Sequence, residues 1–193
     1  MVPSGLPNLN NSCCYLNVVV QVLKSVPDFL SKIEQHATTV ECMDDECIRC
    51  ILWHCFNGYN EELYHLISDI IPGARMTDQQ DAEEFLRGLL TKVSGEDPSL
   101  LDMFQSTWNE STSCVKCSEK RTRGTSIPIV SLSCLDRKFE PVVDILESLK
   151  MEVMQEKINF HCGCGSTQAL QEKKLCFPSS GKYFILHLKR ENF

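Results

Sequence analysis

Apolar residues recur every three or four positions through much of the first half of the chain, a spacing typical of amphipathic helices. One such run begins at Cys14 and ends before Pro27, because a proline cannot continue a helix. A second run covers residues 60–71. A third begins near Thr77, where Thr77 and Gln80 have the spacing of a capping box. The apolar face of the third run consists of Ala82, Phe85, Leu86, Leu89, Leu90 and Val93.

The second half of the chain is predicted to be rich in β-strands. Its β-branched and aromatic residues gather in short segments bounded by turn-forming residues. These segments are 102–113, 122–134, 157–162, 167–175 and 182–188, with one short helix at 142–149. Helices followed by strands are typical of an α+β fold. The seam between the two halves is expected near residues 95–98.

Composition narrows the classes of protein to consider. A chain of 193 residues suits one domain, or one domain with a small subdomain. Its net charge of -7 disfavours nucleic acids and anionic membranes as partners, because both attract surfaces rich in Lys and Arg. The sequence has no recognisable signal peptide and no run of the roughly 20 apolar residues that a membrane helix needs. We therefore expect a cytoplasmic or nuclear protein, and we expect it to be a monomer.

Twelve cysteines without a sign of secretion are expected to be thiols and metal ligands rather than disulfides. Cys114 and Cys117 form a C-x2-C pair, and Cys162 and Cys164 form a C-x-C pair. Two such pairs on neighbouring turns are typical of four thiolates around one structural zinc ion, Zn2+. His161 is an alternative ligand. A redox role of the first pair is disfavoured because no βαβ pattern surrounds it.

A second group of cysteines also has the spacing of metal ligands. Cys42, Cys47, Cys50 and His54 follow one another as C-x4-C-x2-C-x3-H, a pattern that can bind zinc. Alternatively, Cys50 and Cys55 are core residues of an apolar helix and bind nothing.

Cys13 and Cys14 stand where a nucleophile is expected, after a polar loop and at the start of a helix. The helix dipole and the free N–H groups of a first turn lower the pKa of a thiol there. The side chains of Asn8 and Asn10, or backbone N–H groups, are candidate donors to an oxyanion. Two inert thiols at a helix start are the alternative.

Two segments resemble sequence boxes of the ubiquitin-specific proteases, which are deubiquitinating cysteine hydrolases. GLPNLNNSCCYLNVVVQVL, at residues 5–23, is similar to the family's G-L-x-N-L-G-N-T-C-Y-M-N-x-x-x-Q-x-L. QQDAEEFL, at residues 79–86, is similar to Q-Q/E-D-A-x-E-F-L. The first box has one residue more than the family's spacing, and Asn10 replaces a family glycine.

The added residue leaves two candidates for the nucleophile. Counting from Gly5 and Asn8 selects Cys13, whereas counting back from Tyr15 selects Cys14. An extra residue inside a helix rotates all that follows by about 100°, whereas loops accept insertions readily. We therefore favour Cys14, with Cys13 as the second candidate.

The resemblance implies a papain-like α+β fold of thumb, fingers and palm. Its parts are expected at residues 1–98 for the helical thumb, 99–181 for the fingers and 182–193 for the start of an incomplete palm. It implies hydrolysis of the (iso)peptide bond that follows the C-terminal glycine of ubiquitin, with Cys14 or Cys13 as nucleophile. It also implies that Gln80, Asp81 and Glu84 contact the Arg-containing tail of ubiquitin. The four thiols Cys114, Cys117, Cys162 and Cys164 correspond to a zinc ribbon in the fingers.

A general base is needed to deprotonate the thiol. In the family, the general base is the histidine of a G-H-Y box. The segment KYFILHLKRENF resembles the strand that precedes this box. His187 belongs to that strand and is therefore expected to be structural. The printed sequence stops before that box. An inactive ubiquitin-binding scaffold is therefore the alternative to an active deubiquitinase. A zinc-ribbon module without a link to ubiquitin is a third reading, which QQDAEEFL disfavours.

Overall fold

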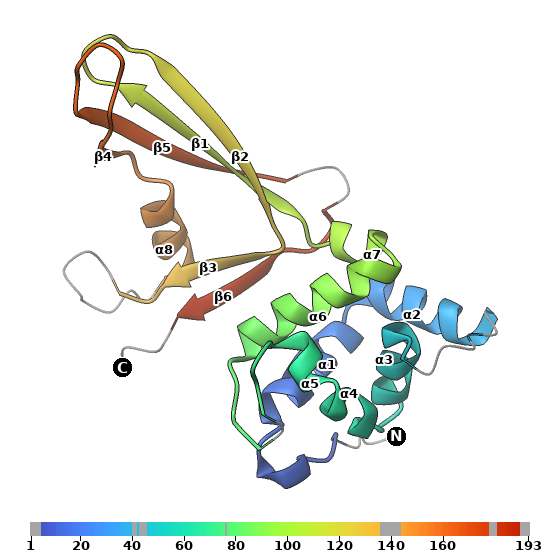
Figure 1. The fold of residues 1–193 in the computed structure, drawn as a ribbon. Coiled ribbons are helices and arrows are strands. Elements are labelled where there is room, and N and C mark those ends of the chain that lie inside the picture. The colour runs from blue at the N-terminus through green and yellow to red at the C-terminus, as the bar shows by residue number, and fades with distance from the viewer. Residues whose placement is uncertain are drawn as a thin grey trace. The chain divides into compact units, whose positions relative to one another are not determined.

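Helices occupy the first half of the structure and strands dominate the second half (Figure 1), which confirms the predicted α+β fold class. The computed structural model describes residues 5–39, 42, 46–75, 77–135, 144–177 and 181–189. The chain divides into two compact units, Met1–Leu101 and Asp102–Phe193. The subdivision into thumb, fingers and palm at residues 98 and 181 stays a prediction.

The first unit is a set of helices around an apolar core. A short 3-10 turn, η1 (Leu9–Asn11), precedes the helices. They are α1 (Cys14–Lys24), α2 (Pro27–Thr39), α3 (Ile48–Phe56), α4 (Glu61–His65), α5 (Ile67–Ile70) and α6 (Ala82–Glu96), with α7 (Ser99–Asp102) at the boundary. Leu16, Phe29, Leu52 and Phe85 are fully buried and come from four of these helices. The periodic apolar faces of the sequence therefore meet in one core.

Two of the predicted helical runs differ in the structure, whereas α1 ends at Lys24, before Pro27, as predicted. The third helical run begins at Ala82 and not near Thr77, because Asp81 caps the helix in place of the predicted capping box. Residues 60–71 form two short helices, α4 and α5, joined at Leu66. Pro27 begins α2, a position where the missing N–H of proline costs nothing.

The second unit contains two sheets. Its larger sheet has the order β2-β1-β5-β4, formed by β1 (Ser106–Cys114), β2 (Lys120–Ile127), β4 (Glu156–Asn159) and β5 (Gln168–Cys176). All of its neighbouring strands are antiparallel, with Trp108 opposite Thr125 on one side and Leu175 on the other. The smaller sheet pairs β3 (Ile129–Ser133) with β6 (Ile185–Lys189) in parallel.

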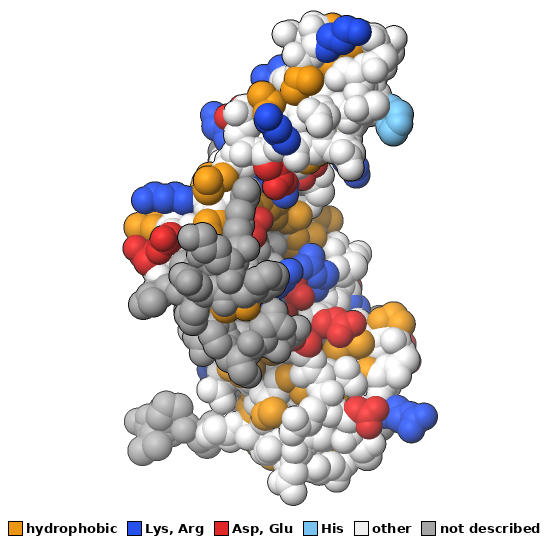
Figure 2. All heavy atoms as spheres, turned by 90° about the vertical axis from the view of Figure 1, so that its left-hand side faces the viewer, with side chains coloured by type: hydrophobic (Ala, Val, Ile, Leu, Met, Phe, Trp, Pro, Cys, Tyr) orange, Lys and Arg blue, Asp and Glu red, His pale blue; other side chains and the backbone are white. Residues whose placement is uncertain are grey.

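Pro128 divides the predicted strand 122–134 into β2 and β3, because proline cannot donate to a sheet ladder. The predicted short helix is α8 (Ile145–Glu152), which contacts β3. Figure 2 shows apolar side chains exposed on the side of the molecule that it draws. Ile145 and Leu146 of α8 and Met154 just after this helix are exposed. No helix in the described part of the chain is long and apolar enough to cross a membrane.

Candidate active site and metal groups

The loop before α1 contains the irregular backbone of this region. Asn10 and Asn11 both have left-handed conformations, with φ of 51° and 56°. Asparagine adopts left-handed backbone angles more readily than most residues do. The resembling family box has a glycine at the position of Asn10, and glycine adopts these angles without strain. α1 itself is regular from Cys14 onward. The irregularity therefore lies in the loop, as expected for an added residue.

Cys13 is enclosed by that loop. It is the N-cap residue of α1 and is 0% exposed. Its sulfur accepts a hydrogen bond from the Leu9 N–H at 2.9 Å, and its own N–H donates to Asn8 Oδ1 at 3.0 Å. Burial raises the pKa of the Cys13 thiol. Both the burial and the raised pKa disfavour Cys13 as a nucleophile, and the choice between Cys13 and Cys14 stays a prediction.

Cys14 differs from its neighbour in exposure. It is the first residue of α1 and its side chain is exposed. The first N–H groups of a helix lack partners within the helix, and the positive end of the helix dipole lies there. This is a position at which a substrate can reach the sulfur.

The two predicted oxyanion residues both help to shape the loop. The Asn8 amide oxygen accepts the Cys13 N–H, and Asn10 Nδ2 donates to the Tyr64 hydroxyl at 2.9 Å. Both side chains are otherwise exposed. Their role toward an oxyanion stays a prediction.

Two buried asparagines hold the loop against the helices, and the sequence did not identify them as a pair. Asn17 Nδ2 and Asn60 Nδ2 each donate to the Pro7 carbonyl oxygen at 2.9 Å. Asn60 Nδ2 also lies 2.7 Å from Asn17 Oδ1. The only signal in the sequence is the interruption of the apolar stretch of α1 by Asn17. These residues position the chain just before the two cysteines.

The two sequence boxes meet in space. Tyr15 of the first box packs edge-to-face against Phe85 of the second, with ring centroids 5.4 Å apart. Asp81 Oδ1 caps α6 by accepting the N–H groups of Glu83 at 2.6 Å and Glu84 at 3.1 Å. Asp81 therefore has a structural role whether or not it also contacts a substrate.

The other two residues predicted to bind substrate lie close to this cap. Gln80 is partly exposed and Glu84 is exposed in the first turn of α6. Contact of Gln80, Asp81 and Glu84 with ubiquitin stays a prediction.

The structure brings the four predicted thiols of the second unit together. Cys114 ends β1, Cys117 lies in the following turn, and Cys162 and Cys164 lie between β4 and β5. The sulfur atoms of Cys114 and Cys164 are 3.6 Å apart, and those of Cys117 and Cys162 are 3.5 Å apart. All four sulfur atoms lie within 4.8 Å of one another.

The surroundings of the four thiols fit a metal ion. The N–H groups of Cys117 and Lys116 are directed at the Cys114 sulfur and lower its pKa to about 6. The pKa of Cys117 is raised and that of Cys162 is raised to about 12, with burial and the neighbouring thiols among the causes, so the fit to zinc rests on the grouping of the four sulfur atoms. Among the described residues, this group contains no histidine, so His161, which is exposed, is not the alternative ligand.

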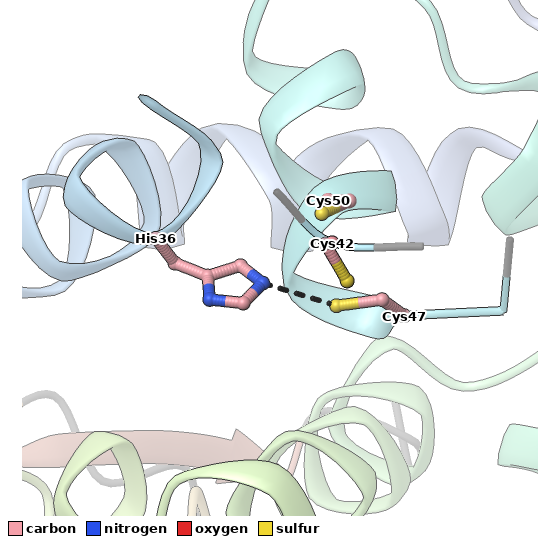
Figure 3. Close-up of side chains that lie close together, drawn as sticks. All are labelled: His36, Cys42, Cys47 and Cys50. Carbon is pink, nitrogen blue, oxygen red and sulfur yellow. Dashed lines mark hydrogen bonds between the residues drawn. The ribbon is translucent and has the colours of Figure 1, made fainter. Parts of the chain in front are cut away.

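The second predicted group has a different histidine. His36, not His54, lies with Cys42, Cys47 and Cys50 (Figure 3). His54 instead pairs with Glu62, its Nδ1 lying 2.9 Å from Glu62 Oε2 on the surface. The sequence missed His36 because it precedes the cysteines and lies on another helix, α2.

Cys55 is a core residue, as the alternative reading held, whereas Cys50, which that reading also placed in the core, is partly exposed and lies in the group with His36. Cys55 is 2% exposed, and burial raises its pKa to about 12.

No hydrogen bond joins a histidine to Cys14 in the described ranges of the first unit. His36 contacts Cys47, His54 contacts Glu62, and the His65 ring lies beside Tyr64. In the second unit, His187 lies within β6, with Nδ1 3.4 Å from Ser131 Oγ of β3. A general base is therefore not identified among these groups.

Comparison with known proteins points to one family. The family model described as ubiquitin carboxyl-terminal hydrolase matches residues 4–193. Human ubiquitin carboxyl-terminal hydrolase 24 is 22% identical over 220 residues, covering 98% of this chain and 8% of that protein. Human ubiquitin carboxyl-terminal hydrolase 17-like protein 6 is 24% identical over 208 residues, covering 98% of this chain and 52% of that protein.

Solved structures of similar fold include two SAGA DUB modules that contain Ubp8. One, bound to monoubiquitin, has a TM-score of 0.76 and 22% identity, and the match covers 97% of this chain and 48% of that chain. The other, bound to ubiquitin aldehyde, has a TM-score of 0.73 and 22% identity, with coverage of 98% and 49%. This chain thus spans about half, or less, of each of these four proteins. Since the family model extends over nearly all of its residues, the chain belongs to the ubiquitin carboxyl-terminal hydrolase family.

Proposed function

We propose that this chain carries the nucleophile and the ubiquitin-tail contacts of a thiol-dependent deubiquitinase. The reaction is hydrolysis of the (iso)peptide bond that follows the C-terminal glycine of ubiquitin. The observation that carries the proposal is the exposed Cys14 at the start of α1, joined through Tyr15 and Phe85 to the helix that begins after Asp81. The description of two similar modules as bound to monoubiquitin and to ubiquitin aldehyde supports ubiquitin as the partner.

The chemistry follows from the position of Cys14. Its thiolate attacks the carbonyl carbon of the terminal glycine, a C–S bond forms, and the amine leaves with a proton as the C–N bond breaks. Water then cleaves the thioester and releases the ubiquitin carboxylate and the Cys14 thiol. N–H groups at the start of α1 and the amide of Asn8 or Asn10 are the proposed donors to the oxyanion.

The tail of ubiquitin is proposed to lie at the start of α6. A carboxylate there forms short, charge-assisted hydrogen bonds to an arginine side chain. Asp81 and Glu84 supply carboxylates and Gln80 supplies an amide, and all three are at least partly exposed.

A structural zinc ion is proposed for the second unit. Cys114, Cys117, Cys162 and Cys164 would hold it, and it would fix the turn after β1 to the segment between β4 and β5. The ion takes no part in the cleavage.

An inactive ubiquitin-binding scaffold is the second candidate. It is favoured by one observation, that no histidine of the described part of the first unit bonds to Cys14. Sequencing the transcript past the codon of Phe193 distinguishes the two candidates. An in-frame G-H-Y box would supply the general base and would favour the active deubiquitinase.

Incubation with ubiquitin that carries a C-terminal electrophile tests the proposal directly. We expect one covalent adduct, found on Cys14 by peptide mass spectrometry. Cys14→Ala is expected to abolish the adduct, whereas the matched Cys13→Ala retains it. Ubiquitin binding without any adduct would establish the scaffold instead. An adduct that needs Cys13 would move the nucleophile by one residue.

The same binding assay separates the two roles of Asp81. Asp81→Asn keeps an oxygen for the cap of α6 but removes the negative charge. We expect unchanged thermal stability and weaker ubiquitin binding. Asp81→Ala is expected to weaken binding and also to lower helix stability by about 1 kcal/mol. Equal ubiquitin affinity in all three proteins would remove Asp81 from the binding site.

A further inference from the structure

Hydrogen bonds from two helices hold the loop before α1 at both of its ends. The Pro7 carbonyl oxygen accepts from Asn17 Nδ2 of α1 and from Asn60 Nδ2 at the start of α4, both at 2.9 Å. Asn60 Nδ2 also donates to Asn17 Oδ1 at 2.7 Å. One turn further along α4, the Tyr64 hydroxyl accepts from Asn10 Nδ2 at 2.9 Å. We call Asn17, Asn60 and Tyr64 the loop clamp.

The loop clamp is buried, whereas the loop that it holds is exposed. Asn60 is 0% exposed and Tyr64 is 3% exposed. By contrast, Pro7, Asn8 and Asn10 are exposed. An exposed loop has few apolar contacts to fix it, and hydrogen bonds shielded from water are the stronger ones. The position of the loop therefore depends on the loop clamp.

The side chain of Asn60 serves the loop and not its own helix. Asn60 is the N-cap residue of α4, a position where an asparagine side chain normally accepts an N–H of the first turn. Its side chain makes no such bond within the described residues 60–65. Among the described residues, its buried Oδ1 has no hydrogen-bond partner. The amide is thus directed to donate to Pro7 and Asn17, although its own acceptor is left unmet.

The segment held by the loop clamp encloses one of the two adjacent thiols. The Leu9 N–H donates to the Cys13 sulfur at 2.9 Å. The same sulfur lies 3.4 Å from the Pro7 carbonyl oxygen and 3.4 Å from Asn8 Oδ1. The Pro7 oxygen therefore contacts both the loop clamp and the Cys13 thiol. Cys14, the next residue, is exposed.

We propose that the loop clamp selects which of the two adjacent cysteines is presented as the reactive thiol. It holds residues 7–10 over Cys13, so that Cys14 alone meets reagents and substrate. Its three members are positioning residues, because each acts through the loop. The selection rests on the proposed function, in which Cys14 is the nucleophile, but it is measurable in the free protein.

Selection matters because both thiols stand at the start of the same helix. A released loop would expose Cys13 beside the first N–H groups of α1, in surroundings that favour a thiolate. The substrate would then meet two competing thiols. The loop also carries Asn8 and Asn10, the proposed donors to the oxyanion. Its release is therefore expected to slow the attack by Cys14 as well.

Alkylation of the purified protein with iodoacetamide tests the selection without ubiquitin. Tandem mass spectrometry fragments the peptide between the two cysteines and assigns each label. In the wild type, we expect rapid labelling of Cys14 and protection of Cys13. Asn60→Asp keeps the shape of the side chain but replaces its donor by an acceptor that faces the Pro7 oxygen. We expect it to raise the labelling rate of Cys13 by about tenfold, because the loop opens more often.

Two controls separate the loop from the rest of the helical core. Asn57→Asp makes the same change nearby in sequence, where the exposed side chain donates to the Trp53 carbonyl oxygen at the end of α3. It is expected to leave Cys13 protected. Cys55, which is 2% exposed, is the internal reference in each sample. It stays unlabelled when Asn60→Asp opens the loop alone.

Tyr64→Phe is the milder variant and decides the question where Asn60→Asp fails to fold. It removes the hydroxyl that holds Asn10, and we expect faster labelling of Cys13 than in the wild type. A Cys13 that stays protected in every folded variant of the loop clamp would overturn the proposal. A joint rise of Cys13 and Cys55 would also overturn it, because the whole core would then have loosened.

Ubiquitin with a C-terminal electrophile separates the selection from the proposed function. In Asn60→Asp, we expect the adduct to form more slowly and to divide between Cys14 and Cys13. A wild type that forms no adduct but shows the expected alkylation pattern would contradict the proposed function and leave the selection standing. An adduct at the wild-type rate on Cys14 alone in Asn60→Asp, with Cys13 protected, would contradict the selection and leave the function standing.

Discussion

At the scale of single residues, Cys13 and Cys14 show what sequence spacing leaves undecided. The spacing favoured Cys14 because insertions are tolerated in loops, and both residues fitted the start of a helix. Burial then separates them, since Cys13 is enclosed by Leu9 and Asn8 while Cys14 is exposed. Such a difference depends on how the preceding loop folds back, which no local pattern specifies.

Metal ligands also show that local sequence patterns miss residues that only the fold brings together. Four thiols were predicted from two short spacings because each pair lies on one turn. His36 joins its group only because α2 and α3 pack together, so its spacing to Cys42 carried no signal.

Tyr15 offers a test of burial by its response to pH. Burial is the main cause that raises its pKa from 10.0 to about 12. Between these values the unfolded state loses the phenol proton before the folded state does. Stability therefore falls as pH rises through this window. We expect Tyr15→Phe to flatten that fall, as measured by urea unfolding between the two pH values.

The same substitution is informative at neutral pH. Among the described residues, the buried Tyr15 hydroxyl has no hydrogen-bond partner. Removing an unsatisfied buried group is expected to raise stability by about 1 kcal/mol. Tyr59→Phe is the control, because Tyr59 is 72% exposed. A loss of stability in Tyr15→Phe at neutral pH would show that the hydroxyl is bonded.

At the scale of elements, the three predicted helical runs and the strand segments could be predicted, whereas α2, α3 and the ends of the elements could not. The apolar periods of α1 and α6 reflect burial on one face, which is a local property of the sequence. The start of α6 was placed too early because Thr77 and Asp81 are both capping residue types, and only the fold shows which one caps. Pro128 within a predicted strand was a usable signal of a break.

Gly88 on α6 tests how closely two elements pack. A Cβ added at Gly88 would meet the Ile70 carbonyl oxygen and would lie 2.9 Å from Ile70 Cγ2 at the end of α5. Helix propensity alone would make Gly88→Ala stabilising. We expect the opposite, a loss of about 1–3 kcal/mol from overpacking. Chemical denaturation measures the difference.

Gly95 is the matched control in the same helix. A Cβ there would meet nothing within 4 Å. We expect Gly95→Ala to stabilise the protein by about 0.5–1 kcal/mol. Equal effects of the two substitutions would mean that α5 moves away from α6 at little cost.

At the scale of the whole molecule, the order of the parts was predictable, since helices precede strands along the chain. The two sequence boxes carried the family, and their packing through Tyr15 and Phe85 explains why they occur together. The division after Leu101 was less predictable. The boundary falls within α7, between Leu101 and Asp102, and a helix of four residues is too short to show a periodic pattern.

The strand pairing of the second unit has a consequence for how the protein folds. Asn109 and Cys176, on the paired strands β1 and β5, are 67 residues apart, and Ser131 and His187, on β3 and β6, are 56 apart. Closing such long loops costs entropy before any contact rewards it, and distant pairing slows folding. In the first unit, α3 contacts its sequence neighbours α2 and α4, although α1 and α6 of that unit also pair over a long sequence distance through Tyr15 and Phe85.

Each unit contains one of the two tryptophans, Trp53 in α3 and Trp108 in β1. In refolding from denaturant, we expect the fluorescence of Trp53 to recover before that of Trp108. Stopped-flow traces of Trp108→Phe and Trp53→Phe isolate the two signals. α3 and its sequence neighbours would then be packed before β1 pairs with β5, so pairing of these two distant strands would come late in refolding.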